Sequence, residues 1–179
     1  MKIIETNNYL QKLIANKLLG KNIANYARLF KTILFFKLSI KYDFGNILSK
    51  LIRKDDVVFD IGANIGQSAC RYSKLVGSSG KVFSFEPVKT NFQFLNKMKR
   101  ILRLKNVTTF NVAIGENSGT ECIYIPIMKN SNIEVGTRAS LRYAENEFKN
   151  AVFRRENVKS KTIDELMMEL KLDRLDVIK

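Results

Sequence analysis

VVFDIGANIG, at residues 57–66, joins a short apolar run to a loop with two glycines. An apolar run of this length, bounded by a glycine, is typical of a buried strand in a parallel sheet. Residues 67–76 follow as a helix, which we expect to end at the turn-forming stretch GSSG, residues 77–80. A strand that passes through a glycine loop into a helix is the opening of an α/β unit.

Further strands and helices follow in the same order. We predict a strand at residues 81–85, a helix at about 91–102 and a strand at 107–111. Two helical crossovers between successive strands imply a parallel sheet with right-handed connections. The predicted fold class is therefore α/β, a Rossmann-like doubly wound parallel sheet.

The pattern is less regular after residue 115. Residues 120–125 alternate like an edge strand, and the polar stretch 128–157 is predicted to be a functional loop or to carry short helices. Thr162 and Glu165 match a capping box, which predicts a helix from there to about residue 170.

A last strand is predicted at residues 175–178, and the sequence stops at Lys179. We expect this strand to have an unpaired edge and uncovered apolar faces, which favour association or misfolding.

The basic charge is concentrated near the N-terminus. Residues 1–54 hold 11 Lys and Arg against two acidic residues, a net of +9, whereas the whole chain carries +14. The spacing of apolar residues over 7–52 predicts helices, which either cover one end of the domain or dock on anionic lipid or an acidic partner. We therefore divide the chain into a basic helical extension, residues 1–52, and a partial α/β domain, residues 53–179.

Composition excludes several classes of site. The chain has no histidine, which excludes imidazole metal ligands and catalysis by Ser-His or Cys-His pairs. Its two cysteines, Cys70 and Cys122, cannot make a disulfide framework and suit a reducing compartment. The sequence contains neither a secretory signal nor an apolar run of the roughly 20 residues needed to cross a bilayer. We therefore expect a cytoplasmic protein without a metal site.

The loop after the first strand contains the candidate ligand contacts. Gly62 is expected to turn where a Cβ would clash, and Gly66 to let the loop or a ligand approach the helix start closely. Asp60 would suit a cationic group on a ligand and repel a pyrophosphate. S-adenosylmethionine carries an ammonium and a sulfonium and no phosphate. The loop therefore favours S-adenosylmethionine over a dinucleotide as the cofactor.

The ends of the next two strands are expected to complete the same pocket. Glu86 follows the second strand, 26 residues after Asp60, where a carboxylate can accept both hydrogen bonds from a ribose diol. Val112 and Ala113 follow the third strand and would flank an adenine. Ligands of such folds bind at the carboxyl ends of parallel strands, so this joint placement predicts one site.

At these positions the sequence resembles the FkbM-like family of class I methyltransferases, over about residues 50–179. The matching segments are VVFDIGANIG at 57–66, GKVFSFEP at 80–87, NV at 106–107, NVAIG at 111–115, KTIDEL at 161–166 and DRLDVIK at 173–179. The resemblance implies methyl transfer from S-adenosylmethionine, usually to an oxygen of a sugar or other small molecule.

The resemblance also implies roles for particular residues. Gly62, Asn64 and Gly66 would line the methionine side of the cofactor, and Glu86 would hold its ribose. In the family, the last strand runs on into an acidic motif of the type Ile-Asp-Val-Glu-Gly, and this chain ends one residue before that motif. The resemblance therefore implies a sheet that is incomplete at the C-terminus, in a fragment of a longer gene product that we expect to be poorly stable alone. We name no catalytic residue. The implied partner is a small-molecule or glycan acceptor, and no nucleic acid is expected.

Two other function classes stay open. A fragment of a dinucleotide-dependent oxidoreductase would use the same fold, but Gly62 and Gly66 do not make G-x-G-x-x-G and Asp60 opposes a phosphate. A non-enzymatic basic module would bind nucleic acid or a membrane surface through residues 1–54. Peripheral membrane contact through residues 1–52 is also compatible with a methyltransferase.

Overall fold

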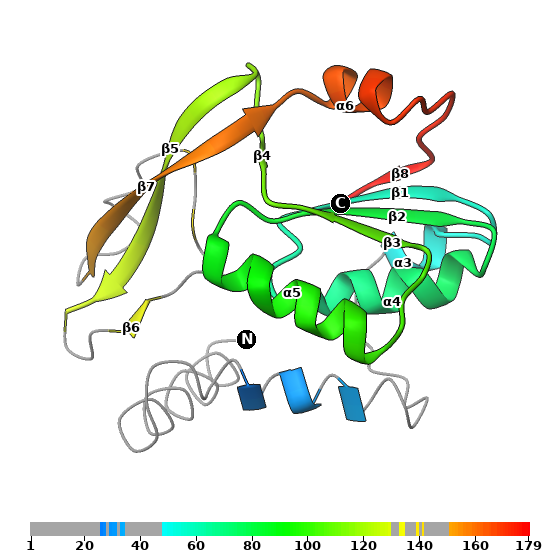
Figure 1. Cartoon of the computed structure of the whole chain (residues 1–179), viewed down its shortest axis with the longest axis horizontal. Coiled ribbons are helices and arrows are strands. Elements are labelled where there is room, and N and C mark those ends of the chain that lie inside the picture. The colour runs from blue at the N-terminus through cyan, green and yellow to red at the C-terminus, as the bar shows by residue number, and fades with distance from the viewer. Residues whose placement is uncertain are drawn as a thin grey trace.

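A computed structural model describes residues 26–27, 29–31, 33–34, 48–129, 133–134, 139, 141 and 151–179. Within these residues a parallel sheet, sheet A, has the strand order β3-β2-β1-β8 (Figure 1). Its strands are β1 (Val57–Ile61), β2 (Lys81–Phe85), β3 (Val107–Phe110) and β8 (Val177–Ile178). Each neighbouring pair is parallel, as the predicted crossovers require. The predicted α/β, Rossmann-like fold class is therefore confirmed.

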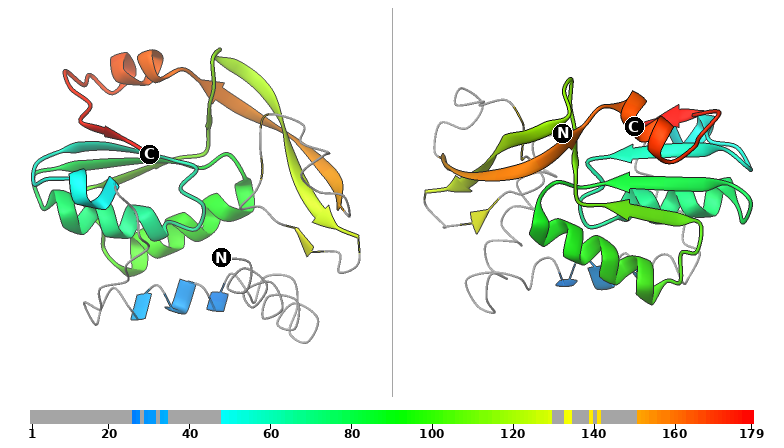
Figure 2. Two further views of the ribbon diagram at one scale, coloured as in Figure 1. Left: turned by 180° about the vertical axis from the view of Figure 1, so that it is seen from behind. Right: turned by 45° about the horizontal axis from the view of Figure 1, so that its top comes forward.

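Helices cover both faces of sheet A. They are α3 (Leu48–Leu51), α4 (Gln67–Val76), α5 (Lys89–Ile101) and α6 (Ile163–Glu169). Helices α4 and α5 lie on one face of the sheet, and α6 lies on the other (Figure 1, Figure 2). The bounds of β1, α4 and β2 match the predicted ones, whereas α5 begins at Lys89 rather than residue 91 and β8 covers only two of the four predicted residues.

Alternation along the strands supplies a core on each face of sheet A. Val58 and Val82 are fully buried in the core that includes α4. Phe59 and Phe85 are fully buried on the opposite face, together with Leu166 of α6, and their ring centroids lie 5.0 Å apart. Because successive side chains of a strand point to opposite faces, an uninterrupted apolar strand requires cover on both sides.

A second sheet, sheet B, projects beyond one end of sheet A (Figure 1). Its order is β4-β7-β5-β6, with β4 (Ala113–Ile114), β5 (Gly119–Met128), β6 (Ile133–Glu134) and β7 (Ala151–Lys161). Strands β5 and β7 pair antiparallel from the Gly119–Ser160 pair to the Met128–Ala151 pair.

One prediction for this region is wrong. The strand predicted at 120–125 lies within β5 and pairs with β7, and among the described residues β6 pairs with β5 at Ile127 and Met128 only. Residues 151–157 of the predicted loop, however, form part of β7. The physical reason is the shallow burial of β7, in which Val158 and Ser160 alone are buried. A strand with so little buried surface shows no alternation of its own, and its pairing with β5 stabilises it instead.

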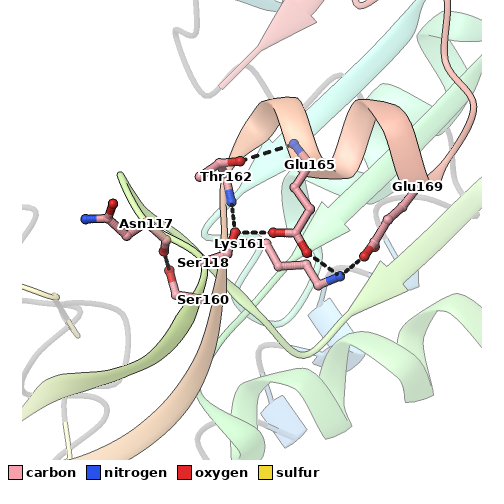
Figure 3. A network of polar contacts seen from close by, with 7 residues as sticks. All are labelled: Asn117, Ser118, Ser160, Lys161, Thr162, Glu165 and Glu169. Carbon is pink, nitrogen blue, oxygen red and sulfur yellow. Dashed lines mark hydrogen bonds and ion pairs between the residues drawn. The ribbon is translucent and has the colours of Figure 1, made fainter.

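Polar contacts join sheet B to α6 (Figure 3). The Thr162 hydroxyl accepts a hydrogen bond from the backbone N–H of Glu165 at 3.1 Å, which confirms the predicted N-cap. In a complete capping box the Glu165 side chain would accept the Thr162 N–H directly. Here the Ser118 hydroxyl lies between them: it accepts the Thr162 N–H at 3.2 Å and donates to Glu165. Lys161 forms ion pairs with both Glu165 and Glu169.

A short part of the N-terminal extension packs on α5. Leu29 is buried in a cluster with Ile65, Phe94 and Met98, and the Tyr26 ring lies edge-on to Phe94 at 5.0 Å. Most of residues 1–52 lies outside the described residues, so docking of the extension on lipid or an acidic partner stays a prediction. Among the helices that the structure describes, none is long and apolar enough to cross a bilayer.

Candidate cofactor-binding site

The glycine loop, residues 60–66, leaves the carboxyl end of β1 and turns into α4. Gly62, Asn64 and Gly66 all have positive φ, at 67°, 54° and 91°. The N–H of Ala63 donates to the Phe85 carbonyl at 3.0 Å, which ties the loop to the end of β2. Glycine adopts a left-handed backbone conformation most easily, and asparagine is among the few other residues that do so. Glycine and asparagine therefore fit these positions of the loop.

The two glycines act differently from the sequence prediction. A Cβ on Gly62 would meet no atom of a more distant residue within 4 Å, so the left-handed φ of 67° is what favours glycine there. A Cβ on Gly66 would lie 2.6 Å from Leu95 Cδ1 and 2.7 Å from Met98 Cε. The close approach at Gly66 is therefore that of α5, and the exposed Gly62 leaves the outer side of the loop open.

Glu86 stands at the end of β2 and organises the loop. It is 4% exposed, and one carboxylate oxygen accepts the Asn64 N–H at 2.7 Å. The other oxygen accepts the Val88 N–H at 3.0 Å and the Asn91 side-chain amide at 3.3 Å. Burial raises the pKa of the Glu86 carboxyl, and the donated N–H bonds oppose that shift. A carboxylate predicted to contact a ribose thus also fixes the glycine loop.

Asp60 is completely buried and already paired with a cation. The Lys179 ammonium lies 3.0 Å from one carboxylate oxygen, and the Ser68 hydroxyl lies 2.9 Å and 2.7 Å from the two oxygens. Lys179 also donates to the carbonyls of Ile61 and Gly62, each at 3.2 Å. Burial raises the pKa of the Asp60 carboxyl, and the Lys179 charge opposes that shift. The cationic group expected beside Asp60 is therefore present within the chain itself.

The remaining predicted residues lie in the glycine loop and after β3. The side-chain oxygen of Asn64 is buried and has no hydrogen-bond partner among the described residues, which is costly unless a donor reaches it. Val112 and Ala113 are 5% and 4% exposed, in the cores under α6 and under sheet B respectively. The Asn111 amide donates to the Glu86 carbonyl at 2.8 Å, which joins the ends of β2 and β3.

Sequence reasoning missed three residues of this site. Ser68 and Asn91 lie in the first turns of α4 and α5 and bind the two buried carboxylates. Their position at a helix start near an acidic strand end was the available signal. Lys179 belongs to a matching family segment, but its contact with Asp60 depends on the pairing of β8 with β1 and has no local signal.

Comparison with known families decides the class of protein. Residues 60–179, more than half of the chain, match the family described as "Methyltransferase FkbM domain". The chain belongs to the FkbM methyltransferase family. The family resemblance seen in the sequence is therefore confirmed. No curated protein sequence matches the chain.

Several solved methyltransferase structures are similar to parts of this FkbM-family chain. Methyltransferase FkbM from Methylobacillus flagellatus KT is 18% identical, with 66% of this chain and 25% of that one covered and a TM-score of 0.39. A SAM-dependent methyltransferase from Aquifex aeolicus is 24% identical over 44% of this chain and 45% of that one, with a TM-score of 0.36. A protein-L-isoaspartate O-methyltransferase is 27% identical over 33% of this chain and 19% of that one, with a TM-score of 0.33.

The chain spans less than half the length of these three solved proteins. Because all three TM-scores are below 0.5, the assignment rests on the match of residues 60–179 to the FkbM domain.

Proposed function

We propose that this chain binds S-adenosylmethionine at the carboxyl edge of sheet A and serves methyl transfer to a hydroxyl of a sugar or other small molecule. The observation that carries the proposal is the position of Glu86. Its carboxylate stands at the end of β2, beside a glycine loop whose backbone it holds by the Asn64 N–H at 2.7 Å.

The residues present fit S-adenosylmethionine. No described residue donates to the buried Asn64 side-chain oxygen, and the α-ammonium of the cofactor is a hydrogen-bond donor that could do so. Gly62 is exposed and leaves the outer side of the loop free of side-chain atoms. The Glu86 oxygen that faces the loop accepts a single described N–H, which leaves it a lone pair for a ribose hydroxyl.

Each predicted residue then has a binding role. Gly62, Asn64 and Gly66 would line the methionine side, and Glu86 would accept from the ribose. Val112 and Ala113 would flank the adenine through their backbone, because their side chains are buried in the two cores. Asp60 would act on the cofactor through the loop, since its carboxylate is bound by Lys179 and Ser68. When bound, the cofactor supplies an electrophilic methyl group.

An open surface hollow supports a hydroxylated acceptor. It has a volume of about 490 Å³, and its lining includes Glu116, Asn117 and Glu121, together with Ile114, which follows Ala113 in the sequence. The side chains of the first three residues carry carboxylates or an amide. These groups accept hydrogen bonds from hydroxyls, so they support a sugar or another small polyol as the acceptor. The small-molecule or glycan partner expected from the sequence is proposed on this basis.

Calorimetric titration of the full chain tests the proposed cofactor. We expect S-adenosylmethionine and S-adenosylhomocysteine to bind at one site per chain and NAD not to bind. The NAD arm matters because Lys179 neutralises Asp60, so charge alone excludes a pyrophosphate less strongly than the sequence indicated. Binding of NAD without S-adenosylmethionine would replace the proposal by the dinucleotide alternative.

The cysteines support the expected compartment. Cys70 and Cys122 are both free thiols, and burial raises the pKa of Cys70 to about 12, which makes this thiol unreactive. A cytoplasmic location is proposed on this ground.

A further inference from the structure

We propose that Lys179 is a positioning residue whose ammonium holds the glycine loop in its binding shape and so couples strand β8 to the cofactor site. The inference deepens the proposed function, on which its binding measurements rest. It starts from one cation that reaches from the end of β8 to three oxygens of a loop in another part of the sequence.

The backbone of Lys179 is fixed before its side chain reaches the loop. Its N–H donates to the Phe59 carbonyl at 3.0 Å, and its carbonyl accepts the Ile61 N–H at 3.1 Å. These two bonds continue the pairing of β8 with β1, in which Val177 lies beside Val58 and Ile178 beside Phe59. The ammonium is therefore placed by the sheet rather than by a flexible surface segment.

The ammonium finds an oxygen for each of its three donors. It lies 3.0 Å from Asp60 Oδ1 and 3.2 Å from each of the carbonyls of Ile61 and Gly62. An exposed ion pair contributes little to stability, but here one partner, Asp60, is completely buried. Removal of the cation would leave a buried carboxylate uncompensated, which is among the costlier losses in a protein.

The same cation links three elements around the candidate cofactor. Asp60, near the end of β1, accepts from Lys179, the residue after β8, and from Ser68 of α4. The Ile61 and Gly62 carbonyls are turned toward the ammonium, which leaves the Ala63 and Asn64 N–H groups directed at β2 and Glu86. Loss of the cation thus removes a restraint from one side of the loop while Glu86 still holds the other.

The test compares the full chain with Lys179→Ala, Asp60→Asn and the double variant, with Lys81→Ala as the matched control. Lys81 is an exposed lysine at the opposite end of β2. Affinity for S-adenosylmethionine is measured by calorimetry, and amide hydrogen exchange of residues 60–66 is measured without ligand. The binding measurement is repeated with n-propylammonium and with n-propanol, which has the same length but no charge.

We expect Lys179→Ala to weaken S-adenosylmethionine binding by about tenfold or more and to speed exchange in the loop, because partners in one buried network couple strongly. Propylammonium should restore most of the affinity, and propanol should not. The double variant should bind more tightly than Lys179→Ala, since Asn at position 60 leaves no buried charge. Lys81→Ala should match the wild type in both measurements.

Two results would overturn the inference: unchanged loop exchange in Lys179→Ala, or equal rescue by propanol and propylammonium. Failure of the wild type to bind S-adenosylmethionine would instead reject the proposed function. In that case the exchange data still decide whether Lys179 holds the loop, because they need no ligand.

Discussion

Two carboxylates are buried at strand ends of sheet A, whereas an ion pair of sheet B is partly exposed. Asp60 of β1 and Glu86, which follows β2, are 0% and 4% exposed and are bound by donors from neighbouring elements. The Arg154–Glu156 pair of sheet B has side chains that are 36% and 23% exposed. A buried carboxylate needs hydrogen-bond or ionic partners in fixed positions, whereas an exposed carboxylate can be replaced with little loss of stability. This difference locates the candidate site on sheet A.

The largest expected effect comes from Glu86→Ala. This change removes the acceptor of the Asn64 N–H and the Val88 N–H and one acceptor of the Asn91 amide. An unsatisfied donor inside a protein costs about 1–3 kcal/mol, so loss of the acceptor of the two N–H groups should cost about 2–6 kcal/mol. Urea unfolding measures the loss, and calorimetry should show no S-adenosylmethionine binding.

Glu156→Ala on sheet B is the matched control for Glu86→Ala. Because Glu156 takes part in a half-exposed ion pair, its loss should cost about 1 kcal/mol or less. Similar losses from the two variants would contradict the contrast between the sheets.

The second effect tests whether sheet B is a separate cooperative unit. Ile125 is completely buried in a cluster with Val88, Ala113, Ile123 and Val158. Ile125→Ala should cost about 2–4 kcal/mol, because a buried Ile truncated to Ala leaves a cavity. We expect faster amide exchange in β5 and β7, with S-adenosylmethionine affinity within a factor of about three of the wild type.

Ile127→Ala provides the control, since Ile127 lies on the same face of β5 and is only half-buried. A loss of cofactor affinity in Ile125→Ala that matches its loss of stability would show that sheet B and the glycine loop unfold together. Val88, which packs in the sheet B core and donates to Glu86, is the residue that would transmit such an effect.

The two sheets also differ in how much of them could be predicted. The strands and helices of sheet A follow from local signals: apolar runs that end in glycine or in a carboxylate at Asp60 and Glu86. The pairing of β5 with β7 could not be predicted, because it joins segments separated by residues 129–150 and β7 buries few side chains. Pairing over such a separation depends on the partner strand rather than on local pattern.

The same distinction holds within the site. Asp60, Glu86 and the positive-φ loop positions were predicted because each stands at a strand end or a turn. The partners of the two carboxylates were not, since Lys179 reaches Asp60 only through the pairing of β8 with β1. Residue type and spacing indicated where charge lies but not which group neutralises it.

A third, smaller effect separates backbone strain from close packing in the loop of sheet A. Gly62→Ala and Gly66→Ala both place a Cβ at positive φ, but only the second meets other atoms within 3 Å. We expect about 1 kcal/mol for Gly62→Ala from the left-handed backbone and about 2 kcal/mol for Gly66→Ala, since overpacking adds to the strain. The added cost is modest because the ends of Leu95 and Met98 can move.

Urea unfolding of the two glycine variants measures this difference. Equal losses would mean that α5 accommodates the methyl group freely. Leu95→Ala with and without Gly66→Ala then supplies the control. Gly66→Ala should cost less in the Leu95→Ala background, because the contact with Leu95 is relieved and only that with Met98 is left.

The smallest effect lies at the junction of the two sheets, where Thr162 caps α6. Its hydroxyl accepts the Glu165 N–H (Figure 3). Leu166 of α6 is buried in the core of sheet A. Thr162→Ala should cost about 1 kcal/mol, as loss of an N-cap usually does, and Thr162→Ser should retain most of that stability. Thermal unfolding detects the difference. Two results would contradict this prediction: slower amide exchange in α6 of Thr162→Ala, or an unfolding temperature of that variant equal to the wild type's. Either would mean that the Ser118 hydroxyl holds the helix start, because it binds both the Thr162 N–H and Glu165.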